Sequence, residues 1–368
     1  MISNRALYYG KLACDTMMKR YQATDLPPKG GFHYHQGVFL SGMMNIYSVC
    51  GDEKYFNYMK DWVDSIVTEP GVIRWFNKGA LDDYMAGIHL VALYERTGDE
   101  KYYAAMQLQM GNLRNWRRNS YGGFWHMEWR ENQMWLDGLY MAGPVQMYYA
   151  KLFDAPYLAE QAVEQAFIMY EHMQDKETGL MYHAWDPTFA APWSNKVTGL
   201  SEEFWGRAMG WYVVAVLDLM EHMDPNSNKY KRLAAIERDV LSAIVKYQDP
   251  KSGAWYQVVN KGSCSDNWHE SSCSCLYTYA IAKAVRMGVV DSSFTSAAQK
   301  GFEAVIREFI TVDNDHLSMC GICIGTGVLK YDGYINRPTS VNDLHGMGAF
   351  LLMCAEIART GQCNPQTA

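Results

Sequence analysis

The sequence predicts an all-α protein with the architecture of an (α/α)6 barrel, a toroid of six helical hairpins. Pairs of amphipathic segments recur along the 368 residues, and apolar side chains return within them every three or four positions. Short turns such as Gly51-Asp52 and Gly98-Asp99 separate the two segments of a pair. Glycine favours the left-handed conformation that ends a helix, and aspartate caps the next one, so these turns indicate helix followed by helix.

Each of the six units combines an aromatic, glycine-rich loop, a first helix that opens with polar residues, a short turn and a second helix. In the first unit, the loop 30–37 precedes a helix over 38–50. The later inner helices are expected to open at Asp82, Asp137, Glu203, Glu270 and Asp343. The outer helices are predicted over 54–67, 101–116, 156–173, 229–247, 293–310 and, as partner of the last unit, 1–21.

Closure of these hairpins into a ring would gather the loops before the inner helices on one face. An open solenoid is the alternative, but its ends would need polar caps, whereas both ends of this chain read as amphipathic helices. No proline-rich or low-complexity linker interrupts the pattern, so we expect one domain over residues 1–368. Strand signals are confined to short loop pieces such as 255–259.

Composition narrows the possible partners and the compartment. A net charge of −7 without a basic cluster argues against nucleic acid and anionic membranes, and no apolar run approaches the roughly 18 residues of a spanning helix. The N-terminal segment lacks the features of a signal peptide, and an odd number of cysteines without framework spacing fits a reducing cytoplasm. We expect a cytoplasmic monomer or weak homodimer.

Two short cysteine pairs raise the question of a metal. Cys320 and Cys323, with Cys273 and Cys275, offer zinc-like spacings, but small thiols buried in tightly packed segments are the favoured interpretation. The sequence therefore predicts no metal and no cofactor.

The stretch from Gly122 to Tyr140 carries the strongest functional signal. It surrounds a few carboxylates and His126 with aromatic residues, the combination of a sugar-binding cleft, where rings stack on the C–H faces of a pyranose. Asp137 opens an apolar helical run, which places its side chain at a loop–helix junction facing the aromatics. The alternative is an N-cap aspartate beside aromatics that belong only to the core.

Loops that share one face would bring a larger set of polar and aromatic residues into one pocket. Arg207 and Trp211 lie four apart on a helix and share a face, and the planar guanidinium suits a uronate carboxylate. An intramolecular pair of Arg207 with Glu202 or Glu203 is equally compatible with the spacing, and a lone His is ordinarily structural. The gathered set is His33, His35, Trp75, Asp82, His126, Trp135, Asp137, His183, Trp185, Trp205, Arg207, Trp211, His269 and His345.

Four segments together resemble the unsaturated rhamnogalacturonyl hydrolases, glycoside hydrolase family 105, over nearly the whole chain. These segments are LDDYMAGIHLVALYERTGDEKY, ENQMWLDGLYMAGPVQMYYAKLF, EEFWGRAMGWYVVAVLDLM and NRPTSVNDLHGMGAFLLMCAEIAR, of which WLDGLYMAGP and FWGRAMGW are the most specific. The resemblance implies the same (α/α)6 barrel. It places the catalytic aspartate on Asp137 and a second one on Asp82, with Asp83 beside it. Sugar-contacting positions of the family correspond to His126, Trp135, His183, Arg207 and Trp211, and His33 or His35 replaces an aromatic of the family.

The resemblance implies a small oligosaccharide substrate, a disaccharide whose 4,5-unsaturated galacturonyl unit is linked to rhamnose. In such enzymes one carboxyl group protonates C4 of the enol ether and then assists water addition at C5. Burial of Asp137 among Trp125, Trp129 and Trp135 would favour its neutral, proton-donating form. Alternatives are a glucuronyl-specific relative, a sugar epimerase with paired histidines, a non-catalytic sugar-binding barrel and a two-carboxylate glycosidase.

Overall fold

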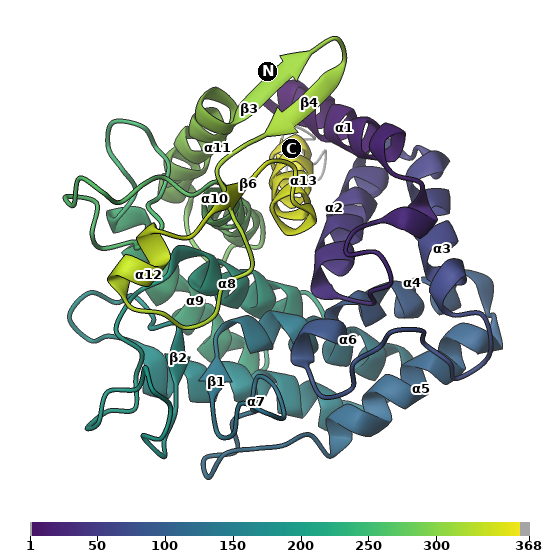
Figure 1. Cartoon of the computed structure of the whole chain (residues 1–368), viewed down its shortest axis with the longest axis horizontal. Helices are drawn as coiled ribbons and strands as arrows, with labels where there is room; N and C mark the ends of the chain where they lie inside the picture. The colour runs from purple at the N-terminus through teal and green to yellow at the C-terminus, as the bar shows by residue number, and fades with distance from the viewer. Residues whose placement is uncertain (1, 361–368) are drawn as a thin grey trace.

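The computed structural model describes residues 2–360 and confirms a helical barrel. Residue 1 and residues 361–368, the ends of the predicted domain, lie outside the described residues. Figure 1 shows an inner ring of helices surrounded by an outer ring. The inner helices are α2 (Tyr34–Cys50), α4 (Ile88–Thr97), α6 (Asp137–Phe153), α8 (Gly206–Met220), α10 (Ser271–Arg286) and α13 (Leu344–Arg359). The outer helices are α1 (Ile2–Arg20), α3 (Glu53–Ile66), α5 (Glu100–Arg114), α7 (Pro156–Met173), α9 (Asn228–Lys246) and α11 (Thr295–Phe309).

The inner and outer helices differ in how much of their surface is buried. Helix α8 is buried at every position except Asp218, because neighbouring helices cover it on all sides. Helix α3 is buried only along one stripe, which includes Tyr55, Met59 and Trp62, and its other face meets solvent. This difference is the one expected between a helix inside a ring and an amphipathic helix around it.

The ring closes between its first and last units. Helix α13 packs against α2 on one side and α10 on the other, and α1 lies against α13. The predicted pairing of the N-terminal helix with the last unit is therefore confirmed, and the open solenoid is wrong.

The Gly-Asp turns have the predicted geometry. Gly51 and Gly98 adopt the left-handed conformation, with φ of 70° and 67°. The carboxylate of Asp52 accepts a hydrogen bond from the backbone N–H of Lys54, at 3.3 Å. Asp99 caps α5 in the same way, through Lys101 at 3.0 Å. One short motif thus ends an inner helix and starts an outer one.

Two inner helices begin later than predicted. Residues 81–87 form two 3-10 turns, η2 (Leu81–Asp83) and η3 (Met85–Gly87), before α4 starts at Ile88. The carboxylate of Asp83 accepts the backbone N–H of Asn77 at 2.7 Å, which holds this segment in a turn. Helix α8 starts three residues after Glu203. Asp82 and Glu203 therefore precede their helices, whereas Asp137, Glu270 and Asp343 stand at helix starts.

The strands lie in loops, as predicted, and form three antiparallel pairs in the described part of the chain. These are β1 (Met134–Trp135) with β2 (Ala184–Trp185), β3 (Ile310–Asp313) with β4 (His316–Met319), and β5 (Ile322–Cys323) with β6 (Thr339–Ser340). The proposed strand at 255–259 is wrong, because this segment makes only isolated bridges. The unpredicted hairpin β3–β4 turns at Asn314 and Asp315, both with positive φ, which is a turn signal that the sequence does contain.

Short helical pieces complete the connections: η1 (Ala23–Asp25), η4 (Ser292–Phe294) and α12 (Tyr331–Ile335). Among residues 2–360, no helix is both long and apolar enough to cross a membrane.

Candidate active site

A cavity of roughly 310 Å³ lies at the end of the barrel where the inner helices begin. Its walls come from the starts of α2, α6 and α8, from the loops that precede these helices, from η2 and from residues 325–327. They comprise His33, Tyr34, His35, Asp82, His126, Met127, Arg130, Trp135, Asp137, Met141, Trp205, Arg207, Trp211, Gly325, Thr326 and Gly327. The predicted gathering of loops on one face therefore produces a pocket of carboxylates, histidines and indoles.

Asp137 is the first residue of α6, and a small strand pair brings His183 beside it. Strand β1 ends at Trp135 and pairs with Ala184 of β2, while the backbone N–H of Leu136 donates to the carbonyl of His183. As a result, His183 Nε2 lies 3.2 Å from Asp137 Oδ2. Neither atom makes a hydrogen bond, because the contact is poorly aligned. The Asp137 carboxylate thus faces the pocket with one buried oxygen unpaired.

Tyr334 fixes the tautomer of His183. The backbone N–H of Leu329 donates to the Tyr334 hydroxyl oxygen at 3.1 Å, so the hydroxyl proton is available for His183 Nδ1, 2.7 Å away. This arrangement leaves the ring proton of His183 on Nε2, toward Asp137. Burial lowers the pKa of His183, and the opposing effect of Asp137 does not compensate for it. His183 is therefore a neutral imidazole.

Asp82 and His126 form a second pair, with a different charge state. His126 Nε2 lies 3.3 Å from Asp82 Oδ1. Burial acts to lower the pKa of His126, but the Asp82 carboxylate outweighs it, and the pKa is raised. Burial likewise acts to raise the pKa of Asp82, but His126 outweighs it, and the pKa is lowered. In this second pair each group therefore favours the charged form of the other.

Asp83 takes no part in the pocket wall. Its carboxylate accepts the backbone N–H of Asn77, and burial, aided by the neighbouring Asp82, raises its pKa to about 7. Of the two adjacent aspartates, the pocket contains Asp82.

Indole rings wall the pocket and separate the two Asp–His pairs. Trp135 stacks on His126 with ring centroids 4.4 Å apart, and it meets His183 edge-on at 5.5 Å. Trp211 stacks on Tyr140 at 4.7 Å. Each of these indoles therefore has one face already covered by a ring of the protein.

The expected shielding of Asp137 by Trp125 and Trp129 is wrong. Neither lines the cavity, and Trp129 is 55% exposed. Trp205 lines the cavity beside Trp135 and Trp211. Trp129 points outward from the loop before β1.

Arg207 is held by backbone carbonyls and not by the acidic residues next to it in sequence. Its guanidinium donates to the carbonyls of Cys323 at 2.6 Å and Ile324 at 2.9 Å. The suggested pairing with Glu202 or Glu203 is wrong, because these carboxylates lie beside Lys330 and Lys261. The buried carboxylate nearest to Arg207 is that of Glu270, 3.9 Å away. These contacts fix the guanidinium at the pocket wall.

Several residues of the gathered set lie elsewhere. Trp75 is 56% exposed, Trp185 stacks on His172, and His269 binds Glu308. His183 is 0% exposed and reaches the cavity only through Asp137, which differs from the direct sugar contact expected of it. The sequence analysis did not predict that the pocket is also lined by Tyr34, Met127, Arg130, Met141 and residues 325–327. Among these, only the Gly-Thr-Gly triplet 325–327 has a local signal for a binding site, because two glycines allow the backbone to approach a ligand closely.

Comparisons with known proteins agree with this arrangement. A family model described as Glycosyl Hydrolase Family 88 matches residues 9–361. A glycoside hydrolase from family 105 of C. acetobutylicum ATCC 824 is 33% identical in sequence, and its structure superposes with a TM-score of 0.89 over 95% of this chain and 99% of that one. The unsaturated rhamnogalacturonyl hydrolase YesR of Bacillus subtilis is 26% identical over 88% of this chain and 89% of its own. The unsaturated glucuronyl hydrolase of Bacillus sp. GL1 shares the fold, with a TM-score of 0.70 at 16% identity over 96% of each chain.

The barrel, its axial pocket and these matches define a glycoside hydrolase of the helical-barrel class. The chain belongs to Glycosyl Hydrolase Family 88, and the resemblance to family 105 is confirmed by the C. acetobutylicum structure.

Proposed function

We propose that this enzyme hydrolyses unsaturated rhamnogalacturonyl disaccharides, releasing a 4,5-unsaturated galacturonyl unit from rhamnose. The observation that carries the proposal is that Asp137 lines a sugar-sized cavity, while its buried Oδ2 lies beside a neutral His183 without a hydrogen bond. The similarity to YesR over most of both chains supports the choice of substrate. The partner is thus a small oligosaccharide.

Asp137 acts first as an acid and then as a base. Its proton passes to C4 of the enol ether, and positive charge develops at C5 and the ring oxygen. Water then attacks C5 while the Asp137 carboxylate takes up its proton. The resulting hemiketal opens, and rhamnose leaves with a keto-uronic acid as the other product. One carboxyl group thus serves both half-reactions, so the carboxylate spacing rule of ordinary glycosidases does not apply.

His183 orients Asp137 and does not compete for its proton. A neutral imidazole with its N–H toward the carboxylate leaves the acid free to exchange a proton with the sugar. Because Tyr334 holds the other ring nitrogen at 2.7 Å, the ring cannot easily adopt the opposite tautomer.

The rest of the pocket binds the sugar. We assign the uronate carboxylate to Arg207, with Arg130 and His126, whose pKa is raised, lining the same cavity. The free faces of Trp135 and Trp211 stack on the ring, and Asp82 accepts hydrogen bonds from its hydroxyls.

The test is incubation with lyase-generated unsaturated galacturonyl-rhamnose in H2(18)O. We expect loss of the enol-ether absorbance together with release of free rhamnose, with the heavy oxygen at C5 of the uronate product. Label on rhamnose, or cleavage of a saturated disaccharide at a comparable rate, would contradict the mechanism. Activity retained by Asp137→Asn but lost with a histidine pair would instead support an epimerase-type site.

A second substrate is favoured by one comparison. An unsaturated 3S-rhamnoglycuronyl hydrolase of Formosa agariphila is 30% identical over 61% of this chain and 57% of its own. A side-by-side panel of galacturonyl-rhamnose and glucuronyl-rhamnose disaccharides, ranked by kcat/KM, separates the two. We expect the galacturonyl substrate to rank first.

A further inference from the structure

Two histidines and an aspartate converge where the ring of helices closes. His35 lies in the first turn of α2, and Asp343 and His345 lie at the start of α13. One ligand atom from each falls within 4.8 Å of the others. Asp343 Oδ1 is 2.9 Å from His345 Nδ1 and 3.6 Å from His35 Nε2. The cluster borders the active-site cavity through His35, but it plays no part in the reaction proposed above.

The tautomer of His345 makes this contact unusual. His345 Nε2 lies 3.0 Å from the carbonyl oxygen of Cys323, which can only accept, so this nitrogen carries the proton. When the ring carries this one proton, Nδ1 is bare and lies 2.9 Å from Asp343 Oδ1. This nitrogen makes no hydrogen bond, although His345 is completely buried. The contact is too poorly aligned for a hydrogen bond, as expected when both atoms point toward a bound cation instead of toward each other.

His35 also contacts a second histidine through its other ring nitrogen. Its Nδ1 lies 2.9 Å from Nδ1 of His33, whose other nitrogen is 3.9 Å from Asp83. When His35 donates this hydrogen bond, its Nε2 is unprotonated and faces Asp343. Histidines that bind metals typically donate their second N–H to a carbonyl or to another polar group, as both rings here can.

We propose that His35, Asp343 and His345 bind a zinc ion. Two imidazole nitrogens and one carboxylate oxygen are a donor set that zinc favours. In a tetrahedral site with zinc–nitrogen distances of about 2.0–2.1 Å, the ligand atoms stand roughly 3.3 Å apart, which small side-chain rotations achieve here.

The ion would clamp the first inner helix to the last. The ligands come from opposite ends of the chain and meet only in the closed ring, so the unfolded chain lacks this site. Zinc bound to the folded state alone raises the stability of that state. This inference departs from the sequence-based expectation of no metal, and it uses none of the cysteines considered there.

Metal content of the purified full chain tests the site directly. After treatment with a chelator, dialysis against micromolar zinc and then against metal-free buffer, we expect about one zinc ion per chain by mass spectrometry. His345→Gln keeps an amide that can donate to the Cys323 carbonyl but removes the ligand nitrogen, and Asp343→Asn is nearly isosteric. Both variants should lose the bound zinc, whereas Cys320→Ser and His316→Gln, which alter an exposed thiol and an exposed imidazole, should retain it.

Two further measurements distinguish a lost site from a lost fold. Circular dichroism of the metal-free variants should match that of the metal-free wild type. Zinc at a hundredfold excess over Kd should raise the melting temperature of the wild type by roughly 2–5 °C, and should not raise that of the variants. Cobalt in place of zinc should give visible bands without a thiolate charge-transfer band.

Either of two results would overturn the proposal. In the first, the wild type retains no zinc, which would make Asp343 and a doubly protonated His345 an ordinary ion pair. Alternatively, His345→Gln and Asp343→Asn retain zinc while Cys320→Ser loses it, which would place the metal on a surface thiol.

Discussion

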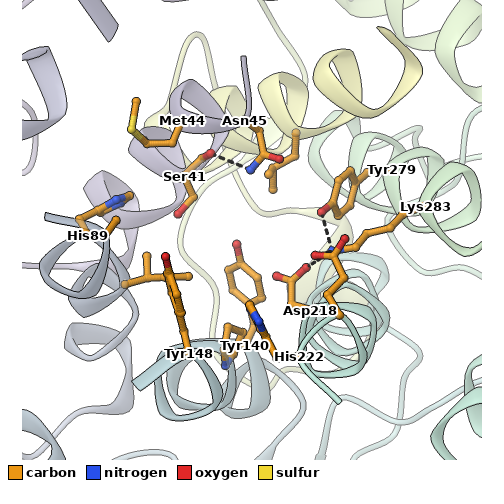
Figure 2. A pocket seen from close by; sticks show the side chains of 15 residues that line it. Ser41, Met44, Asn45, His89, Tyr140, Tyr148, Asp218, His222, Tyr279 and Lys283 are labelled. Carbon is orange, nitrogen blue, oxygen red and sulfur yellow. Dashed lines mark hydrogen bonds and ion pairs between the residues drawn. The ribbon is translucent and has the colours of Figure 1, made fainter. Parts of the chain in front are cut away.

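The barrel holds two cavities, toward its two ends, that differ in how their charges are paired. Figure 2 shows the second cavity, of roughly 220 Å³, which residues of all six inner helices line. Tyr140, whose hydroxyl points into this second cavity, stacks on Trp211 of the active-site wall, so one aromatic pair separates the two spaces.

In the second cavity the charged groups are paired with one another. The buried Lys283 ammonium lies 2.5 Å from the Asp218 carboxylate and 2.8 Å from that of Glu221, and donates to the Tyr279 hydroxyl at 3.1 Å. In the active site, by contrast, Asp137 keeps an unpaired oxygen. The same ring of helices therefore pairs its charges at one end, which stabilises the fold. At the other end, the proposed active site, it leaves one carboxylate oxygen without a hydrogen bond.

The largest expected effect is on activity, at the active-site end. Asp137→Asn preserves shape but removes the acid, so kcat/KM should fall by about 10⁴-fold, the upper range for general acid–base catalysis. The free energy of unfolding should change little, because this carboxylate oxygen makes no hydrogen bond. Absorbance assays with chemical denaturation of the same samples measure both. A stable variant with near-normal turnover would remove Asp137 from the mechanism.

The second effect is on stability, at the other end. Lys283→Met leaves Asp218 and Glu221 without their buried partner and should cost about 3–5 kcal/mol of unfolding free energy. Well below the melting temperature, kcat/KM should stay unchanged. Lys29→Met is the matched control, since Lys29 pairs with Asp25 on the surface, and it should leave stability nearly unaltered. Loss of turnover in folded Lys283→Met would show that the two ends are coupled.

A smaller loss of activity should follow when Asp137 is kept but the residues that position it are changed. His183→Gln removes the ring that lies 3.2 Å from Asp137, and a misplaced acid should lower kcat by about 10²-fold while KM changes little. Tyr334→Phe deletes only the hydroxyl that fixes the tautomer and should have a weaker effect in the same direction. Steady-state kinetics of both variants provides the measurement. A rise in KM at constant kcat would indicate that His183 contacts the sugar.

The sequence predicted the fold well because the signals that define it are local. Helical periodicity and the Gly-Asp turns each lie within a few residues, and repetition of one hairpin leaves few arrangements other than a ring. The start of α4 was misplaced because a tertiary contact, the Asp83 hydrogen bond to Asn77, holds residues 81–87 in 3-10 turns. The hairpin β3–β4 was not predicted, although Asn314 and Asp315 are residue types that favour a turn.

The site was predictable only in part. Motif residues such as Asp137, Arg207 and Trp211 do line one cavity. The position of His183 behind Asp137 depends on pairing of β1 with β2, which no local pattern specifies. The carbonyls that hold Arg207 come from a loop more than a hundred positions away along the chain. Long-range backbone contacts therefore decided what each predicted side chain touches.

The smallest expected effect concerns the pH dependence of stability, and it separates the two Asp–His pairs within the active site. His126 has a raised pKa, so its stabilising contribution is complete below the unfolded value of about 6.5 and is lost as the pH rises through the folded value. Asp82 has a lowered pKa and contributes above about 3.9, losing that contribution as the pH falls through its folded value. This pair therefore stabilises most between about pH 4 and 6.5.

Between pH 6 and 8, the wild type should lose the stabilisation that depends on His126. In Asp82→Asn, burial of His126 is no longer outweighed by Asp82 and lowers its pKa, so the His126 contribution should reverse sign and favour the folded state as the pH rises. Denaturation curves at several pH values, with His126→Asn as the reference that lacks the titrating ring, isolate this contribution. An identical slope in all three proteins would mean that Asp82 does not favour the charged form of His126, and the distinction from the neutral His183 beside Asp137 would fail.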